Sequence, residues 1–298
     1  MSSFSKPIPI INLQAFGKFI VLIINSPTTH LFKDLTMNAQ SSSSASTLLR
    51  PILTALAVII TLITNTLAVV LPLNNRSTEA ISDSFKVFFT PAGYVFSIWS
   101  VIYTGLLAFA VYCFLPRNRT NPTLTAIFPW FMLSCATNSA WIFLWHYGFY
   151  PLTMLVMLVL LVSLVMIYLR ADIGVQPYSG SNFWCLRFPF SVYLGWICVA
   201  TIANATALLY DIGWSGFGVS PELWTAIMIA VALAVGGFFI ELRRDAVLVG
   251  VLVWAFIGIG VKHTAVPIVG MSAWIAATCA GALMLRGVWL SRKQRQTV

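Results

Sequence analysis

Long uninterrupted apolar runs dominate this chain, and their lengths suit helices better than strands. A helix needs about 20 residues to cross the roughly 30 Å hydrocarbon core of a bilayer, and shorter runs suffice when flanking side chains snorkel. Eight runs meet this criterion, at about Pro51–Leu73, Gly93–Leu115, Leu124–Tyr147, Leu152–Leu169, Phe188–Tyr210, Leu223–Ile240, Ala246–Val261 and Ala265–Leu285. Because the runs do not alternate every second residue, they predict about eight transmembrane helices and not a β-barrel.

Composition supports the same fold class, an all-α integral membrane protein. Hydrophobic residues make up 59% of the 298 residues and charged residues only 8%. Soluble domains average about 45–50% and 25%. The run Ala246–Val261 is the shortest of the eight, because charged residues bound it at Asp245 and Lys262.

The distribution of basic residues predicts the orientation. With both termini in the cytoplasm, only three of the 17 Lys and Arg residues lie in outer loops, namely Arg76, Lys86 and Lys262. This bias follows the positive-inside rule. The net charge of +9 is thereby explained by topology and by contact with anionic lipid, so the sequence gives no reason to expect a nucleic-acid partner.

Residues 1–49 differ from the rest of the chain and are expected to be a dispensable leader. They contain an apolar run from Ile8 to Asn25, interrupted by Lys18, and then a serine-rich tract. Translation from Met37, a transit peptide and an interfacial helix are all compatible with this pattern. We expect the plasma membrane as the location by default, and an organelle membrane if the leader is a transit peptide.

The residues that usually carry chemistry are sparse. The five cysteines are dispersed and form no CxxC pair, which disfavours a metal site or a disulfide framework. All eight acidic residues and all three histidines fall in expected loops or at helix ends, so no buried carboxylate is predicted. We therefore expect no catalytic residue, no metal and no required cofactor, although His146, Asp211 and His263 could meet at the outer mouth.

Aromatic and amide side chains recur at helical spacing in three of the expected spans. In the fifth span, Tyr193, Trp196, Ala200 and Asn204 lie at i, i+3, i+7 and i+11, which places them on one helix face. The small Ala200 leaves space between aromatic neighbours. Such stripes also serve as packing surfaces or interfacial belts, and a buried Asn often links helices.

The second and third spans carry similar stripes. Phe96, Trp99 and Tyr103 follow the spacing i, i+3, i+7 within FTPAGYVFSIWSVIY, and the third span carries Asn138, Trp141 and Trp145 around the motif NSAW. Three stripes together favour a pocket between helices.

At these motifs the chain resembles the TspO/MBR family, the tryptophan-rich sensory proteins that include the translocator protein. The segment YLGWICVATIAN matches the fifth-helix pattern of that family at Tyr193, Leu194, Trp196, Ala200 and Asn204. The order of the motifs also agrees. Between Phe96 and Trp99 the chain is one residue shorter than the family pattern, and one residue turns a helix by about 100°.

The resemblance implies a five-helix core over residues 50–212, followed by a divergent extension over 213–298 with three more helices and a basic tail. It also implies a flat hydrophobic ligand such as a tetrapyrrole (porphyrin or haem), bound for sensing, regulation or transport. The expected binding residues are Trp99, Tyr103, Asn138, Trp141, Tyr193, Trp196, Ala200 and Asn204.

Two other functions stay open at this stage. One is a small-molecule transporter without an intramembrane carboxylate, and the other is an enzyme that modifies a tetrapyrrole. The extension carries small residues every fourth position, at Ala226, Ala230 and Ala234 and again at Ala273, Ala277 and Gly281. This spacing lets helices approach closely. Internal packing is the favoured interpretation, and a homodimer is the alternative.

Overall fold

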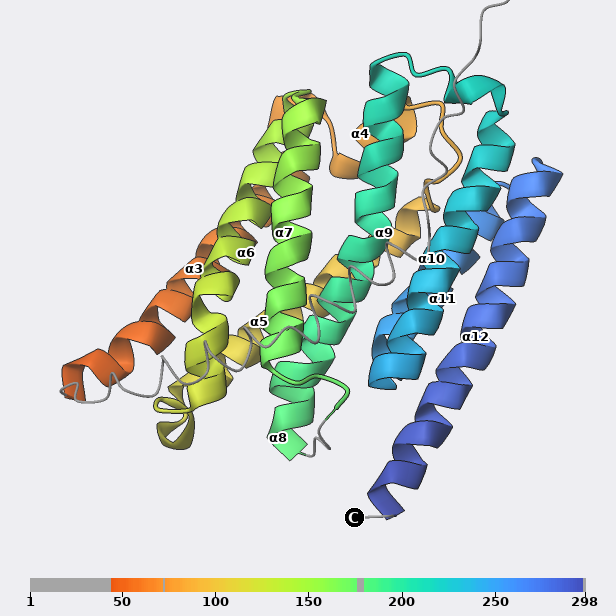
Figure 1. Cartoon of the computed structure of the whole chain (residues 1–298). Helices are drawn as coiled ribbons and strands as arrows, with labels where there is room; N and C mark the ends of the chain where they lie inside the picture. Colours follow the sequence, from red (N-terminus) through yellow and green to blue (C-terminus); the bar gives the residue numbers. More distant parts are fainter. Residues whose placement is uncertain (1–43, 72, 176–179, 297–298) are drawn as a thin grey trace, which may run out of the picture. The chain divides into compact units, whose positions relative to one another are not determined.

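The computed structural model describes residues 44–71, 73–175 and 180–296, and Figure 1 shows it as a ribbon. Residues Ser46–Val298 form one compact unit. Its described part contains helices and no strands. The long helices are α3 (Ser44–Val70), α5 (Ile98–Phe114), α6 (Pro122–His146), α7 (Tyr150–Arg170), α9 (Phe188–Asp211), α10 (Pro221–Arg243), α11 (Ala246–Lys262) and α12 (Pro267–Gln296).

The predicted all-α membrane fold is confirmed, with one qualification on the number of spans. Within the described residues, seven helices are long and apolar enough to cross a membrane. The eighth, α11, is an apolar helix of 17 residues. At 1.5 Å per residue it is about 25 Å long, slightly less than the hydrocarbon core. The orientation of the termini stays a prediction.

Proline and short polar residues set several helix starts. Pro122 and Pro221 occupy the first turns of α6 and α10, where a missing N–H costs nothing. Asn121 accepts a hydrogen bond from the Thr123 amide, and Ser220 accepts one from the Leu223 amide, so each side chain caps the helix that follows.

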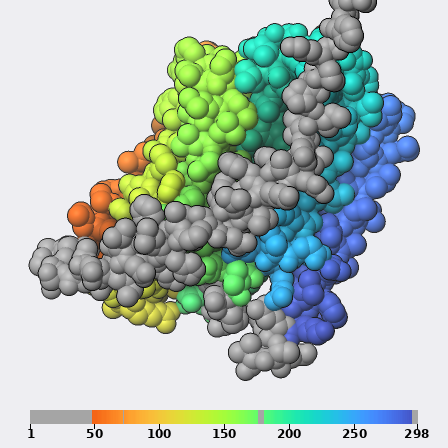
Figure 2. All heavy atoms as spheres, viewed as in Figure 1, coloured from red at the N-terminus to blue at the C-terminus, as the bar shows by residue number. Residues whose placement is uncertain are grey.

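Helix α9 occupies the centre of the unit. It packs against α5 and α7 on the core side and against α11 on the side of the extension. Helices α10 and α11 both pack against α12. At Gly195 a side chain would meet α11, since an added Cβ would lie 3.0 Å from the Leu248 carbonyl oxygen. In Figure 2, α3 (orange) and α12 (blue) lie at opposite edges of the unit.

The boundaries of the leader and of the basic tail differ from the predicted ones. Most of the predicted leader (1–43) lies outside the described residues, but α3 already begins at Ser44, before the predicted start at Pro51. Helix α12 continues past Leu285 to Gln296, so the basic tail is helical. Lys, Arg and Gln are good helix formers, and positive charge favours a helix C-terminus.

The two small-residue stripes of the extension behave differently. Ala273 and Ala277 of α12 are buried, as expected for internal packing. Ala230 and Ala234 of α10 are exposed, so the expectation of internal packing was wrong there. The buried face of α10 runs instead through Thr225, Ile229, Ala232, Gly236 and Ile240, because that face meets the neighbouring helices.

Candidate ligand-binding cavity

An apolar cavity of about 60 Å³ lies between α5, α6, α7 and α9, and the segment that links α3 to α5 covers one end of it. Six of the eight predicted binding residues line it: Trp99, Asn138, Trp141, Trp196, Ala200 and Asn204. The other lining residues are Thr78, Ser82, Val87, Thr90, Pro91, Phe96, Trp145, Met157, Leu160, Ile197, Val199, Ala203 and Ala207. The three stripes therefore meet around one space.

Aromatic rings form two sides of the cavity. The Trp196 ring stands edge-on to Phe96 and Trp99, with ring centroids 5.9 and 6.1 Å apart. Trp141 and Trp145 stack on one another at 5.3 Å. Phe96 belongs to a 3₁₀ turn, Gly93–Ser97, that precedes α5. A 3₁₀ turn has three residues per turn, so Phe96 and Trp99 share a face although the spacing is shorter than in the family pattern.

The Asn138 side chain links three helices at the edge of the cavity. Its Oδ1 accepts a hydrogen bond from Asn65 Nδ2 of α3 at 2.8 Å, and its Nδ2 donates to the Tyr193 hydroxyl of α9 at 2.7 Å. Asn138 is buried, so both bonds compensate a polar group removed from water.

The Asn204 side chain makes a second three-helix link. Its Oδ1 accepts from Trp141 Nε1 of α6 at 2.9 Å, and its Nδ2 donates to Thr153 Oγ1 of α7 at 3.1 Å. The side-chain amides of Asn138 and Asn204 are therefore both hydrogen-bonded within the protein, and these bonds hold the walls of the cavity in place.

The two predicted tyrosines lie behind the lining residues. Tyr103 stacks on Trp99 at 5.4 Å, and Tyr193 accepts the bond from Asn138. Prediction missed Trp145 and the residues between Thr78 and Pro91. The stripe that contains Trp145 was visible in the sequence, whereas nothing in the link between α3 and α5 indicated contact with the cavity.

Comparison with known proteins supplies the family. A family model described as TSPO-like protein matches residues 51–286, which is most of the chain. The chain belongs to the TSPO-like protein family. The predicted resemblance to the TspO/MBR proteins is thereby confirmed at the level of the family, and the match extends through α10, α11 and most of α12. Neither a curated protein nor a solved structure matches the chain.

One polar atom at the cavity of this TSPO-like protein has no partner. The Nε1–H group of Trp196 is buried and meets no hydrogen-bond acceptor within the part of the chain that the structure describes. The residue is 3% exposed. A buried donor left unpaired costs about 1–3 kcal/mol, so this indole offers a hydrogen bond at no further desolvation cost.

The cap segment, residues 77–92, covers the cavity and contains the short helix α4 (Thr78–Ser84). Ser77 caps α4 by accepting a hydrogen bond from the Ala80 amide. Phe85 is buried and anchors the segment on the core, with its ring 5.7 Å from Trp145 and 5.0 Å from Tyr150. The cap segment thus belongs to the cavity.

His146 and His263 contact this cap segment. His146 is buried and donates from Nδ1 to the Ile142 carbonyl at 2.8 Å, which leaves Nε2 to accept from Thr78 Oγ1 at 3.4 Å. His263 donates from Nε2 to the Thr90 carbonyl at 3.0 Å. Both histidines therefore bond to the cap segment.

Asp245 lies at a helix end as expected, but it corrects the expectation that no carboxylate is buried. It lies at the N-terminus of α11, where it is fully buried. One carboxylate oxygen accepts from the Tyr168 hydroxyl of α7 at 2.9 Å and from Ser191 Oγ of α9 at 2.6 Å. The other accepts from the Val247 and Leu248 amides at 3.1 and 3.3 Å. The sequence showed the charged stretch Glu241–Asp245 but not the helices that enclose its last residue.

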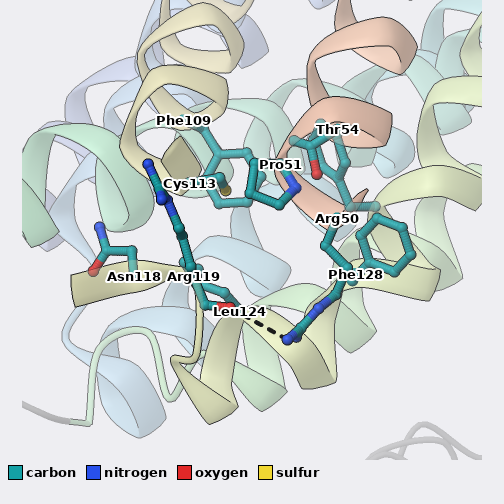
Figure 3. A pocket seen from close by; sticks show the side chains of 10 residues that line it. Arg50, Pro51, Thr54, Phe109, Cys113, Asn118, Arg119, Leu124 and Phe128 are labelled. Atoms are coloured by element: carbon teal, nitrogen blue, oxygen red, sulfur yellow. Dashed lines mark hydrogen bonds between the residues drawn. The ribbon is translucent and has the colours of Figure 1, made fainter. Parts of the chain in front are cut away.

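A second cavity of about 20 Å³ lies where α3 begins and α6 begins (Figure 3). Arg50 Nη2 donates to the Arg119 carbonyl at 3.2 Å, and Arg119 Nε donates to the Phe114 carbonyl at 3.0 Å. These guanidinium groups satisfy carbonyls at helix ends. The volume suffices for about one water molecule, so this cavity is a packing feature.

Within the described ranges, no group of three His, Cys, Asp or Glu side chains lies close enough together to hold a metal ion. Of the two cavities described above, the one between α5, α6, α7 and α9 is the larger.

Proposed function

We propose that this membrane protein binds a flat hydrophobic ligand in the cavity between α5, α6, α7 and α9. The convergence of Trp99, Trp141 and Trp196 on one apolar space carries this proposal. Planar π-systems favour stacked and edge-on contacts with such rings, worth about 0.5–1.5 kcal/mol per pair beyond the burial of area. Ala200 shapes the space by its small size.

We propose one polar contact between the protein and the ligand. The side chains of Asn138, Asn204 and Tyr193 already form hydrogen bonds with residues of neighbouring helices. We therefore propose that they hold the cavity walls in place and do not contact the ligand directly. Trp196 lines the space, and its Nε1–H group is buried without a hydrogen-bond partner among the described residues. A ligand with an acceptor on its edge would remove the cost of leaving this donor unsatisfied.

Family membership suggests a tetrapyrrole as the ligand class, and the volume sets a condition on it. Sites for drug-sized ligands have volumes of about 300–1,000 Å³, whereas this cavity measures about 60 Å³. We therefore propose that a porphyrin enters only when the cap segment moves outward, while a bicyclic ring fits with smaller changes. Sensing or regulation follows naturally, because ligand binding would then change the position of the cap segment.

A titration in nanodiscs tests the proposal. Protoporphyrin and quinoline are added while the fluorescence of the 11 tryptophans is recorded. Ala200→Leu places a larger side chain in the cavity, and Ala230→Leu adds the same atoms on the exposed face of α10. We expect saturable quenching by at least one ligand in the wild type and in Ala230→Leu. In Ala200→Leu we expect the affinity to fall by at least about tenfold, which corresponds to a loss of about 1.4 kcal/mol of binding free energy.

Trp196→Leu supplies the complementary variant, since it removes both a wall and the unpaired N–H group. Quenching that never saturates and is equal in all variants would mean partition into lipid, and the cavity would then be a packing defect. A porphyrin absorption spectrum that stays constant over hours is expected for binding. Steady decay would indicate an enzyme, and counterflow in proteoliposomes would indicate a transporter.

A further inference from the structure

We propose that Lys262 and His263, at the C-terminal end of α11, are positioning residues that clamp the cap segment over the cavity. The C-terminal extension would thereby control access of a ligand to a site built by the core. This inference rests on the proposed function of the cavity and adds a regulatory element that the cavity residues themselves do not contain.

Lys262 makes three contacts with the cap segment. Its ammonium group pairs with Asp83 Oδ1 at 2.5 Å, and it donates to Thr90 Oγ1 at 3.2 Å and to the Pro91 carbonyl at 3.4 Å. Thr90 and Pro91 both line the cavity. An ammonium group has three donors and no acceptor, so this one side chain commits its hydrogen-bonding capacity to the cap segment.

His263 holds the same stretch from the next position in the chain. Its Nε2 donates to the Thr90 carbonyl at 3.0 Å, and its ring stands edge-on to Phe88 with centroids 5.5 Å apart. Neighbouring residues of the extension therefore grip both the backbone and a side chain of the cap segment.

The backbone of α11 approaches the end of the cap segment closely. The Ala92 amide donates to the Gly258 carbonyl at 3.0 Å, and Trp254 Nε1 donates to the Val95 carbonyl at 3.1 Å. An added Cβ at Gly258 would lie 2.2 Å from Val95 Cγ2 and 3.1 Å from Pro91 Cβ. Glycine at position 258 is thus required for this approach, which makes the contact a feature of the α11 sequence.

The core holds the opposite end of the cap segment. Trp145 Nε1 donates to the Thr78 carbonyl at 3.3 Å, and Phe85 is buried beside Trp145. If the α11 contacts open, the segment can pivot about this buried anchor and uncover the cavity. The Lys262–Asp83 ion pair can open and close readily. The two side chains are 24% and 45% exposed, and ion pairs in contact with solvent contribute little free energy.

Hydrogen–deuterium exchange in nanodiscs without ligand tests the clamp directly. Lys262→Met removes the charge and keeps most of the side-chain length. Arg286→Met is the matched control, because it breaks the Arg286–Glu241 pair between α12 and α10. We expect amides from 83 to 92 to exchange about tenfold faster in Lys262→Met and at the wild-type rate in Arg286→Met. Unchanged exchange in Lys262→Met would overturn the clamp.

Stopped-flow quenching with protoporphyrin then tests access. We expect association to be several times faster in Lys262→Met than in the wild type and Arg286→Met. Faster exchange with equal association rates would overturn the control of access. Faster exchange with no saturable binding in any variant, the wild type included, would instead refute the proposed function and leave the clamp intact.

A second variant keeps the test informative if Lys262→Met folds poorly. Asp83→Asn removes the ion pair from the cap segment and leaves α11 unchanged. It should accelerate exchange of amides 83–92 in the same direction and by a smaller factor, since Lys262 keeps its contacts with Thr90 and Pro91. Wild-type exchange rates in Asp83→Asn as well as in Lys262→Met would leave no support for the clamp.

Discussion

The aromatic cavity and the surroundings of Asp245 use buried polar groups in opposite ways. Around Asp245, four donors converge on one carboxylate and close the interface between the core and the extension. Around the cavity, the amides bond sideways between helices, and one indole N–H stays unpaired. The first region is built for stability, while the second preserves a space and a free donor, as expected for a site that receives a ligand.

The strongest test of this contrast is Asp245→Ala. The substitution leaves the Tyr168 and Ser191 hydroxyl groups and two amides without their acceptor, and it should lower the free energy of unfolding by about 3 kcal/mol or more. Glu241→Ala is the control, because Glu241 is exposed and pairs with Arg286 at the surface. We expect about 1 kcal/mol or less for the control. Equal effects in reversible unfolding experiments would refute the structural role of Asp245.

Asn204→Leu should have the next largest effect. It removes the partner of Trp141 Nε1 and of Thr153 Oγ1, so we expect a loss of about 2 kcal/mol. Thr201→Val is a suitable control on the same helix, since the Thr201 hydroxyl bonds only to the Ile197 carbonyl of its own turn. A neutral Asn204→Leu would show that Asn204 does not support the walls and would return it to the candidate ligand contacts.

Tyr193→Phe probes the same network more gently. Only the hydroxyl that accepts from Asn138 Nδ2 is lost, so the free energy of unfolding should fall by about 1 kcal/mol. Tyr94→Phe removes a hydroxyl from a side chain that is 45% exposed and should change little. Thermal unfolding of both variants in one detergent gives the comparison, and a larger loss in Tyr94→Phe would contradict it.

The smallest expected effect is a pH dependence at the cap segment. Burial lowers the pKa of His263, and Lys262 acts in the same direction, while the bond to the Thr90 carbonyl and the charge of Asp83 oppose the shift. Because the pKa of His263 is lower when the cap segment is attached, His263 takes up a proton at a higher pH in the released state than in the attached state. Attachment of the cap segment should therefore be complete above about pH 6.5 and weaken as the pH falls through the folded-state pKa.

Exchange rates of amides 83–92 at pH 7.5 and at pH 5.5, corrected for intrinsic exchange, measure this effect. His263→Gln retains an N–H donor and should abolish the pH dependence. A pH dependence that persists in His263→Gln would assign it to another group.

The aromatic cavity could be predicted from the sequence better than the surroundings of Asp245. The stripe Tyr193, Trp196, Ala200, Asn204 predicted a helix face, and α9 turns Trp196, Ala200 and Asn204 toward the cavity. Tyr193, at the start of that stripe, shares the same face within about 20° of Asn204 but lies about three turns away along α9, where its hydroxyl meets Asn138 and does not line the cavity. Asp245 was not recognised, since a charged turn looks the same in sequence whether it faces water or three helices.

Apolar run length and the spacing of aromatic residues determined the helical membrane fold, most of the helix boundaries and the aromatic part of the cavity wall. These properties are local, because the length of a helix and the direction of its faces depend on neighbouring residues. Tertiary structure alone decided that Asp245 is enclosed, that both buried amides find protein partners, and that α11 grips the cap segment. Such contacts join residues as far apart as Asp83 and Lys262, and their formation depends on how helices pack.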